Sequence, residues 1–308
     1  MPSFDDVLAH VLTKKPFLTA TTPRALLAHI EETALDFEQP IDAVIWHASS
    51  VDRLGLAFTA GYSVATRVLS ARLGASLPGH TSLAATETGG AHPRAIETKL
   101  EREGTAFSLT GSKLWCTLAF EASHLVVIAK EGEHAGRPLL RAVIVPVGRE
   151  GVTLEAMPDA PFCPEVQHAT VTLSRVPIAA SEIATVDAYA DVLKPFRTIE
   201  DSYVHAALLA WLTGVAVHEC FTPEIAERSI ALVAASRSIA SLAPLASATH
   251  RALAGVIDET NALLAACEAE WERAASEITA RYRRDLPLIS IAGRARRARL
   301  ERARAESV

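Results

Sequence analysis

Hydrophobic positions at both ends of the chain follow the spacing of helices. Apolar residues recur every three or four positions in residues 7–12 and 26–30, and Thr22–Pro23 marks a helix start because proline is favoured at the first helical position. From about residue 185 the chain is rich in Ala and Leu and again follows helical spacing, which predicts a helical bundle. The longest apolar stretch, Ala206–Val217, contains Thr213 and Gly214, and we interpret it as a buried helix.

The middle of the chain changes to a strand pattern. Short runs rich in β-branched residues, separated by Gly and Pro, predict a small barrel or sandwich; they are 124–129, 139–147, 152–154 and 166–176. Phe107–Leu109 alternates into the turn-like Thr110–Ser112, and Leu114–Thr117 leaves it, so we predict a hairpin there. The order helix, β, helix predicts three domains, with bounds at 1–81, 82–183 and 184–308.

Two motifs within this middle region suggest a ligand site. Thr86–Gly90 places a hydroxyl, a carboxylate and two glycines where a strand gives way to a loop, and glycine lets the backbone approach a flat ligand closely. The second motif, Leu109–Thr117, contains Gly111, Lys113 and Trp115. An ordinary structural turn with a core Trp explains either motif alone, but their order, with strands after them, favours a site.

Composition excludes several classes of protein. The 308 residues are 49% hydrophobic with a formal net charge of −6, which allows two or three domains and gives no reason to expect nucleic acid. The cysteines are scattered without metal-site spacing, which predicts no metal and a reduced, cytoplasmic protein. The N-terminus lacks the layout of a signal peptide, and no segment approaches the roughly 20 apolar residues that span a bilayer.

The two motifs resemble the fingerprints of the central domain of acyl-CoA dehydrogenases. Thr86–Thr98 is similar to T-E-P-G-x-G-S-D followed by I-x-T, and Leu109–Thr117 to N-G-x-K-x-W-I-T. The resemblance implies an α+β multidomain fold with an N-terminal helical domain, a central β-barrel or sandwich domain and a C-terminal helical bundle. It also implies FAD as cofactor, an acyl-CoA thioester as substrate, and an oligomer. Both helical parts are short for the family.

The resemblance also implies cofactor contacts. Leu83, Ala85 and Thr86 match the strand that lies against the isoalloxazine ring. Trp115 and Thr117 match the pair that packs on the ring near N5, with Cys116 in place of the usual Ile between them. Ordinary strand packing is the alternative for this pair.

Where the family's substrate-contacting Ser and Asp stand, this chain has Ala91 and His92, with one residue missing from the loop. His92 can interact with a phosphate of substrate or cofactor. A solvent-exposed loop His is the favoured interpretation.

Catalysis in this family needs a carboxylate base, and its usual position near the C-terminus has no equivalent here. The arginine-phenylalanine-glycine element that grips a neighbour's FAD is also absent. A subset of the family places the base on the first helix of the C-terminal bundle, where Asp201 lies at or beside the matching position, next to Glu200. Asp201, Val204 and His205 share a helical face. The alternative is that both acids are first-turn residues favoured by the helix dipole.

Residues 281–308 contain a basic stripe that can bind phosphates or an acidic partner, or form a solvated face. Its members are Arg281, Arg283, Arg284, Arg294, Arg296, Arg297, Arg299, Arg302 and Arg304.

Two functions stay open. One is a FAD-dependent acyl-CoA dehydrogenase, or a relative that uses the same flavin site. The other is a degenerate, non-catalytic member that serves as a binding or partner subunit, in a homo-oligomer or with a homologue.

Overall fold

The computed structural model describes residues 1–33, 37–74 and 77–306, and the chain divides into two compact units. The helical unit comprises Met1–Ala65, Ala160–Glu165 and Arg197–Val308, and the β unit comprises Thr66–Asp159 and Val166–Phe196. The helices of both chain ends thus belong to one unit. The three-domain division with bounds at 81/82 and 183/184 stays a prediction.

The one helix start predicted from a local signal, Thr22–Pro23, is confirmed. Ser3 caps α1 in a capping box with Asp6, and α2 begins at Pro23 as expected. The helices are α1 (Phe4–Leu12), α2 (Pro23–Thr33), α3 (Pro40–Ala48), α4 (Leu54–Arg72), α5 (Lys194–His218), α6 (Pro223–Ala240), α7 (Ser247–Ala266), α8 (Glu268–Trp271), α9 (Ser276–Asp285) and α10 (Gly293–Ala305).

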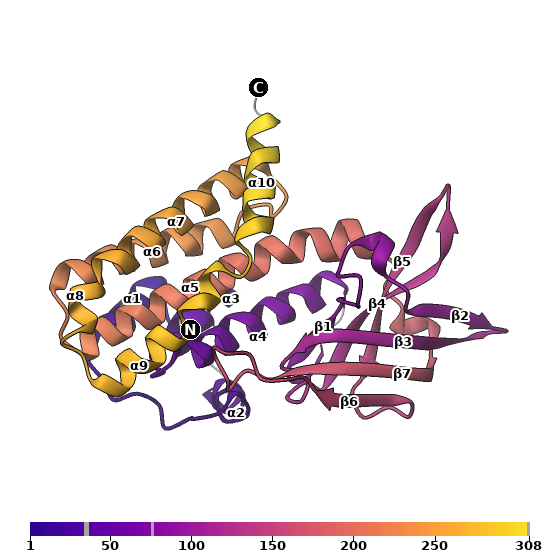
Figure 1. The fold of residues 1–308 in the computed structure, drawn as a ribbon, viewed down its shortest axis with the longest axis horizontal. Coiled ribbons are helices and arrows are strands. Elements are labelled where there is room, and N and C mark those ends of the chain that lie inside the picture. The colour runs from indigo at the N-terminus through magenta and orange to yellow at the C-terminus, as the bar shows by residue number, and fades with distance from the viewer. Residues whose placement is uncertain (34–36, 75–76, 307–308) are drawn as a thin grey trace. The chain divides into compact units, whose positions relative to one another are not determined.

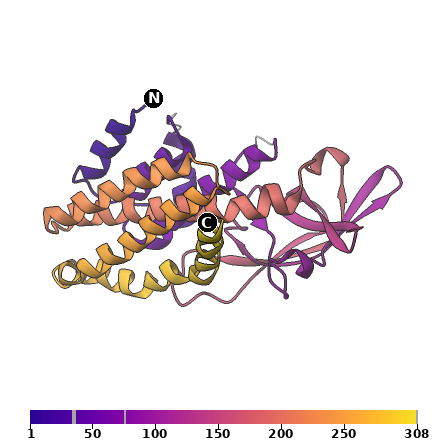
Figure 2. The ribbon, with the colours of Figure 1, turned by 90° about the horizontal axis from the view of Figure 1, so that it is seen from above.

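Helix α5 forms the centre of the helical unit. Its segment 206–216 is buried, which confirms the predicted buried helix, and Gly214 allows the α3 end to approach at the Ser49 carbonyl. Trp211 stacks in turn on Trp271 with ring centroids 6.0 Å apart. Helices α6 and α7 run side by side in both views, and α10 packs on α7 (Figures 1 and 2). Within the described residues, no helix is long and apolar enough to cross a membrane.

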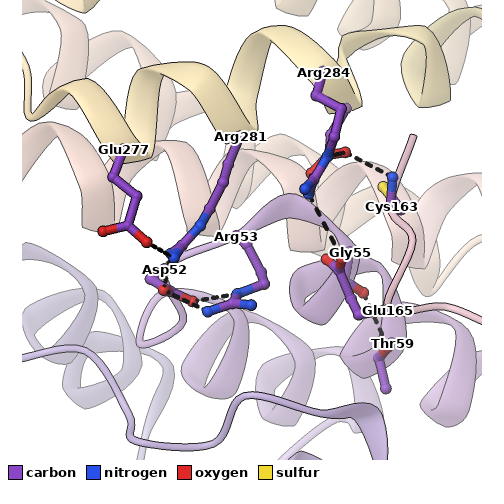
Figure 3. A network of polar contacts seen from close by, with 10 residues as sticks. Asp52, Arg53, Gly55, Thr59, Cys163, Glu165, Glu277, Arg281 and Arg284 are labelled. Atoms are coloured by element: carbon purple, nitrogen blue, oxygen red, sulfur yellow. Dashed lines mark hydrogen bonds and ion pairs between the residues drawn. The ribbon is translucent and has the colours of Figure 1, made fainter. Parts of the chain in front are cut away.

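Ion pairs hold the segment 160–165 against the helices of its unit (Figure 3). The backbone N–H of Cys163 donates to Asp285 at 2.6 Å, and Asp285 accepts from Arg284 at 2.7 Å. Arg284 also lies 3.6 Å from Glu165. Beside them, Asp52 accepts from Arg53 and Arg281. Buried carboxylates are costly unless paired, so this network explains why the acids are tolerated here.

The strands of the β unit form one curled sheet, which confirms the predicted central β domain. Their order is β1-β4-β2-β3-β7-β6, and β5 pairs with β4 (Figure 1). The bounds are β1 (Thr81–Ala84), β2 (Lys99–Glu103), β3 (Ala106–Thr117), β4 (His124–His134), β5 (Arg137–Pro146), β6 (Val152–Ala156) and β7 (His168–Ile178). The predicted runs 124–129, 139–147, 152–154 and 166–176 coincide with β4 to β7.

The predicted hairpin around Gly111 is wrong. Residues 106–117 form the single strand β3, and the actual hairpin joins β2 to β3 at Gly104, whose φ is +66°. Gly111 instead lies at a register shift between β3 and β7. A Cβ there would meet the Cα of Thr98 at 2.7 Å. The turn-like residues therefore mark a bulge and a close backbone approach, which use the same residue types as a turn.

Candidate functional site

The fold brings the two sequence motifs side by side. The Ser82 hydroxyl, on β1, donates to the carbonyl of Thr117 at 2.7 Å. The N–H of Leu114 donates to the carbonyl of Thr86 at 2.8 Å, so the chain beyond β1 continues along β3. Of the predicted cofactor-binding residues here, Ala85 is buried, whereas Leu83 and Thr86 are half-buried. The two segments thus lie side by side and are joined by these hydrogen bonds.

A buried ion pair anchors the first motif. Glu87 accepts from Lys113 at 2.6 Å and from the N–H groups of Glu97 and Thr98 at 2.8 and 3.1 Å. Lys113, fully buried, also donates to the carbonyl of Ile128. Burial alone would raise the pKa of Glu87, but hydrogen bonds and the charge of Lys113 outweigh it and hold the pKa below its usual value. No local pattern in the sequence marks these two residues as a pair.

Trp115 is turned outward by an irregularity in β3. The pairing with β7 shifts register between Lys113 and Cys116, and Trp115 has a φ of +57°. Its side chain is 51% exposed, and its N–H donates to Sδ of Met157 at 3.1 Å. A bulky residue at positive φ is strained, and such strain is typical of functional positions. The β-bulge thus aims the indole away from the core and leaves it half exposed.

Thr117 and Cys116 lie on opposite faces of β3. The Thr117 hydroxyl lies 3.2 Å from Nδ1 of His168, at the start of β7. His168 also meets the indole of Trp115 edge-on, with ring centroids 5.6 Å apart. The Cys116 side chain is fully buried in the hydrophobic core of the β unit, so it points away from the face that carries the Trp115 indole. Sequence reasoning missed His168, because nothing local marks a contact between residues 51 positions apart.

Beyond the first motif, His92 is exposed, as the favoured interpretation expected. Its Nδ1 accepts a hydrogen bond from the N–H of Arg94 at 3.3 Å and so caps a short helical turn, Pro93–Ala95.

The predicted catalytic acids lie on α5 in the helical unit. Asp201 is buried and accepts from Arg296 at 2.8 Å and from Arg299, both on α10. Glu200 is half-buried, and burial, followed by the neighbouring Asp201 charge, raises its pKa to about 7. The first-turn alternative is wrong, because α5 begins at Lys194 and no acid lies in its first turn.

A small cavity is lined by His205 and Arg296, which both contact Asp201. His205 Nδ1 donates to the carbonyl of Asp201 at 2.9 Å, and among the described residues its Nε2 has no partner. Burial lowers the pKa of His205 to about 4, so its ring is neutral at neutral pH. Together with His205 and Arg296, the cavity is lined by apolar side chains: Leu54, Phe58, Val204, Leu208, Leu288 and Ile289.

Five arginines of the predicted basic stripe form ion pairs with acidic side chains. Arg281, Arg283 and Arg284 pair with carboxylates near α9, and Arg296 and Arg299 pair with Asp201. The remaining members, Arg294, Arg297, Arg302 and Arg304, are exposed on α10. In the part of the chain that the structure describes, no cluster of side chains could hold a metal ion.

Comparisons with known proteins agree with this architecture. Residues 82–176 match the family model of the acyl-CoA dehydrogenase middle domain. Butyryl-CoA dehydrogenase from Megasphaera elsdenii is similar with a TM-score of 0.68 and 15% identity, over 97% of each chain. Glutaryl-CoA dehydrogenase from Mycobacterium smegmatis has a TM-score of 0.63 and 14% identity, over 97% of this chain and 93% of that one.

A third solved structure is that of TdsC from Paenibacillus sp. A11-2 with FMN and indole. Its TM-score is 0.61 and its identity 17%, over 85% of this chain and 83% of that one. No curated protein matches the chain. Residues 82–176 thus match the acyl-CoA dehydrogenase middle domain in sequence, and the chain has the acyl-CoA dehydrogenase fold.

Proposed function

We propose that this protein is a FAD-dependent oxidoreductase acting on the CH–CH group of an acyl-CoA thioester. The observation that carries the proposal is the bulge in β3, which presents the 51% exposed indole of Trp115 beside Thr117 and next to the Thr86 segment. These residues fit a flavin ring, because they offer an aromatic face, a hydroxyl and backbone groups on one side of the sheet. FAD supplies the acceptor for the substrate hydride.

Each residue of this surface has a role in binding. The Trp115 indole would pack on the ring, and the Thr117 hydroxyl would contact the region of N5. Backbone groups of Leu83, Ala85 and Thr86 would hold the other side of the ring, and the Cys116 side chain packs in the core of the β unit. The Glu87–Lys113 pair holds the backbone of the first motif in place.

Of the two acids on α5, Glu200 is the better candidate for the general base. A base works best when its pKa lies near the working pH, and that of Glu200 is raised to about 7. Asp201 is held between Arg296 and Arg299, so its role is to position the α10 arginines and the α5 turn that contains Glu200.

The test is anaerobic reduction of the bound flavin by a panel of acyl-CoA thioesters. We expect the parent to bleach with at least one thioester and Glu200→Gln to bleach about 10²–10⁴-fold more slowly. The exposed Glu224, on α6, provides a matched control as Glu224→Gln, which should bleach as the parent does. Equal rates for Glu200→Gln and the parent would remove Glu200 from the mechanism, and Asp201→Asn tests the other acid in the same way.

The second candidate function is a non-catalytic partner subunit. It is favoured by the Asp201 carboxylate, which two guanidinium groups already occupy. Flavin that is retained but bleached by no thioester would support it, as would co-purification with a catalytically active homologue.

We propose that the protein forms a homo-oligomer, or a hetero-oligomer with such a homologue, in the cytoplasm. The thiols of Cys116, Cys163, Cys220 and Cys267 are free, as a reducing compartment requires.

A further inference from the structure

We propose that His168 is a positioning residue for the flavin, which sets the direction of the Thr117 hydroxyl and steadies the Trp115 indole. This inference rests on the proposed function, because it takes the flavin to lie on the Trp115 and Thr117 face. It adds a residue outside both sequence motifs, on a strand that follows them by about fifty positions.

Two contacts join His168 to this face. Its Nδ1 lies 3.2 Å from the Thr117 hydroxyl, and its ring meets the Trp115 indole at an interplanar angle of 71°. Both partners lie on β3, so one side chain of β7 contacts the two residues that face the ligand. A serine, threonine or alanine at position 168 would be too short to reach both.

The backbone around His168 is fixed from both sides. Thr117 and His168 are direct register partners, and the carbonyl of His168 accepts from Met157 N–H at 2.9 Å. Met157 in turn accepts from the N–H of Trp115 through its sulfur. The positions of Trp115, Thr117, Met157 and His168 are therefore coupled, which a preorganised binding face needs.

His168 acts as a neutral ring. Burial lowers its pKa, and no charged group contributes to that shift. A neutral imidazole either donates or accepts at Nδ1 according to its tautomer, and a threonine hydroxyl has a single proton. When Nδ1 donates, the hydroxyl proton is free to point toward the ligand; when Nδ1 accepts, the hydroxyl offers its lone pairs instead.

The tautomer of His168 matters because N5 of a flavin forms different hydrogen bonds in its two oxidation states. N5 accepts a hydrogen bond in oxidised flavin and carries a hydrogen in reduced flavin. A neutral His168 can serve both states by exchanging tautomers, whereas a fixed donor or a fixed acceptor would favour one. His168 thus influences the relative affinity for the two states without contact with the substrate.

The experiment measures the dissociation constants of oxidised and reduced FAD with four apoproteins, the parent and three variants. The parent is compared with His168→Phe, which keeps an aromatic ring against Trp115 but has no Nδ1, and with His168→Asn, whose amide can stand where Nδ1 stands. Thr117→Val removes the other partner. We expect His168→Phe and Thr117→Val to change the ratio of the two constants by about threefold to tenfold, the range of one hydrogen bond. His168→Asn should restore the parent ratio to within about twofold.

A second readout needs no flavin. The ¹⁵N chemical shift of His168 Nδ1 in the apoprotein should change in Thr117→Val, because the hydrogen bond is lost. If the parent binds FAD but His168→Phe leaves the ratio unchanged, this inference is overturned while the proposed function stands. If the parent binds no FAD, both fall. Should His168→Phe fail to fold, the Asn and Thr117→Val variants decide the question.

Discussion

Trp115 is the residue on which the proposed flavin site depends most. Its indole is exposed and its backbone lies at positive φ, so the side chain adds little to folding and the conformation costs about 1–2 kcal/mol. A structure retains such a position when the outward side chain has another use.

Replacement of this side chain should therefore separate binding from stability. We expect Trp115→Ala to weaken FAD binding about tenfold or more, because aromatic contact area is lost. Its thermal unfolding should change little, by roughly 1 kcal/mol or less for an exposed position. Fluorescence titration with FAD and a thermal melt measure the two effects. Tyr189→Ala, at another exposed aromatic of the β unit, is the control and should bind FAD normally.

The raised pKa of Glu200 predicts that the stability of the protein depends on pH. Its pKa is raised from 4.5 to about 7, so the folded protein holds this proton more tightly than the unfolded chain. The cost of ionising Glu200 is absent below about pH 4.5, grows through the interval up to about pH 7, and is complete above it.

Glu200→Gln cannot ionise and avoids that cost. We expect it to be about 3 kcal/mol more stable than the parent at about pH 8, with the difference fading toward pH 4.5. Urea unfolding across this pH range measures it. A variant that is less stable than the parent at about pH 8 would show that Glu200 is not desolvated.

At the scale of elements, β3 shows where sequence patterns stop being informative. Alternation along 107–117 correctly placed Trp115 and Thr117 in a strand. The same segment also contains Thr110–Ser112, whose residue types suit both a turn and a bulge. Only pairing with β7 and the approach of Thr98 distinguish the two, and both are non-local.

The close approach at Gly111 can be tested by adding one methyl group. Gly111→Ala brings Cβ to within 2.5 Å of the Thr98 hydroxyl, so we expect a loss of about 1–3 kcal/mol in the free energy of unfolding. Gly132, on β4, lies at another register shift but has open space around its Cβ position. Gly132→Ala should therefore cost well under 1 kcal/mol. Equal effects of the two changes would contradict the bulge as the structure describes it.

At the scale of the whole molecule, the order helix, β, helix and the central β domain followed from periodicity and from two motifs. The pairing of side chains that are far apart in the sequence could not be predicted in this way. Arg237 reaches Asp42 across 195 positions, and Arg296 reaches Asp201 across 95. Such pairs depend on how the helices pack. The sequence alone does not show which arginine of the C-terminal stripe pairs with Asp201. His168 was missed because its contact with Thr117 depends on the pairing of β3 with β7, which is equally non-local.

The grouping of both chain ends into one helical unit was not foreseen either. Periodicity detects helices one by one, and says nothing of which of them share a core. Helices α1 and α3 belong with α6 because Arg237 pairs with Asp42 and lies 4.1 Å from the ring of Phe4. Ion pairs and cation–π contacts of this kind become visible only in three dimensions.

The visible absorption spectrum shows whether the β unit holds a flavin through Trp115 and Thr117. The purified protein is incubated with FAD and passed through gel filtration, beside Trp115→Ala and Tyr189→Ala. We expect the parent and Tyr189→Ala to retain the absorption of oxidised flavin and Trp115→Ala to lose most of it. A parent protein that emerges colourless after incubation with FAD would contradict the account.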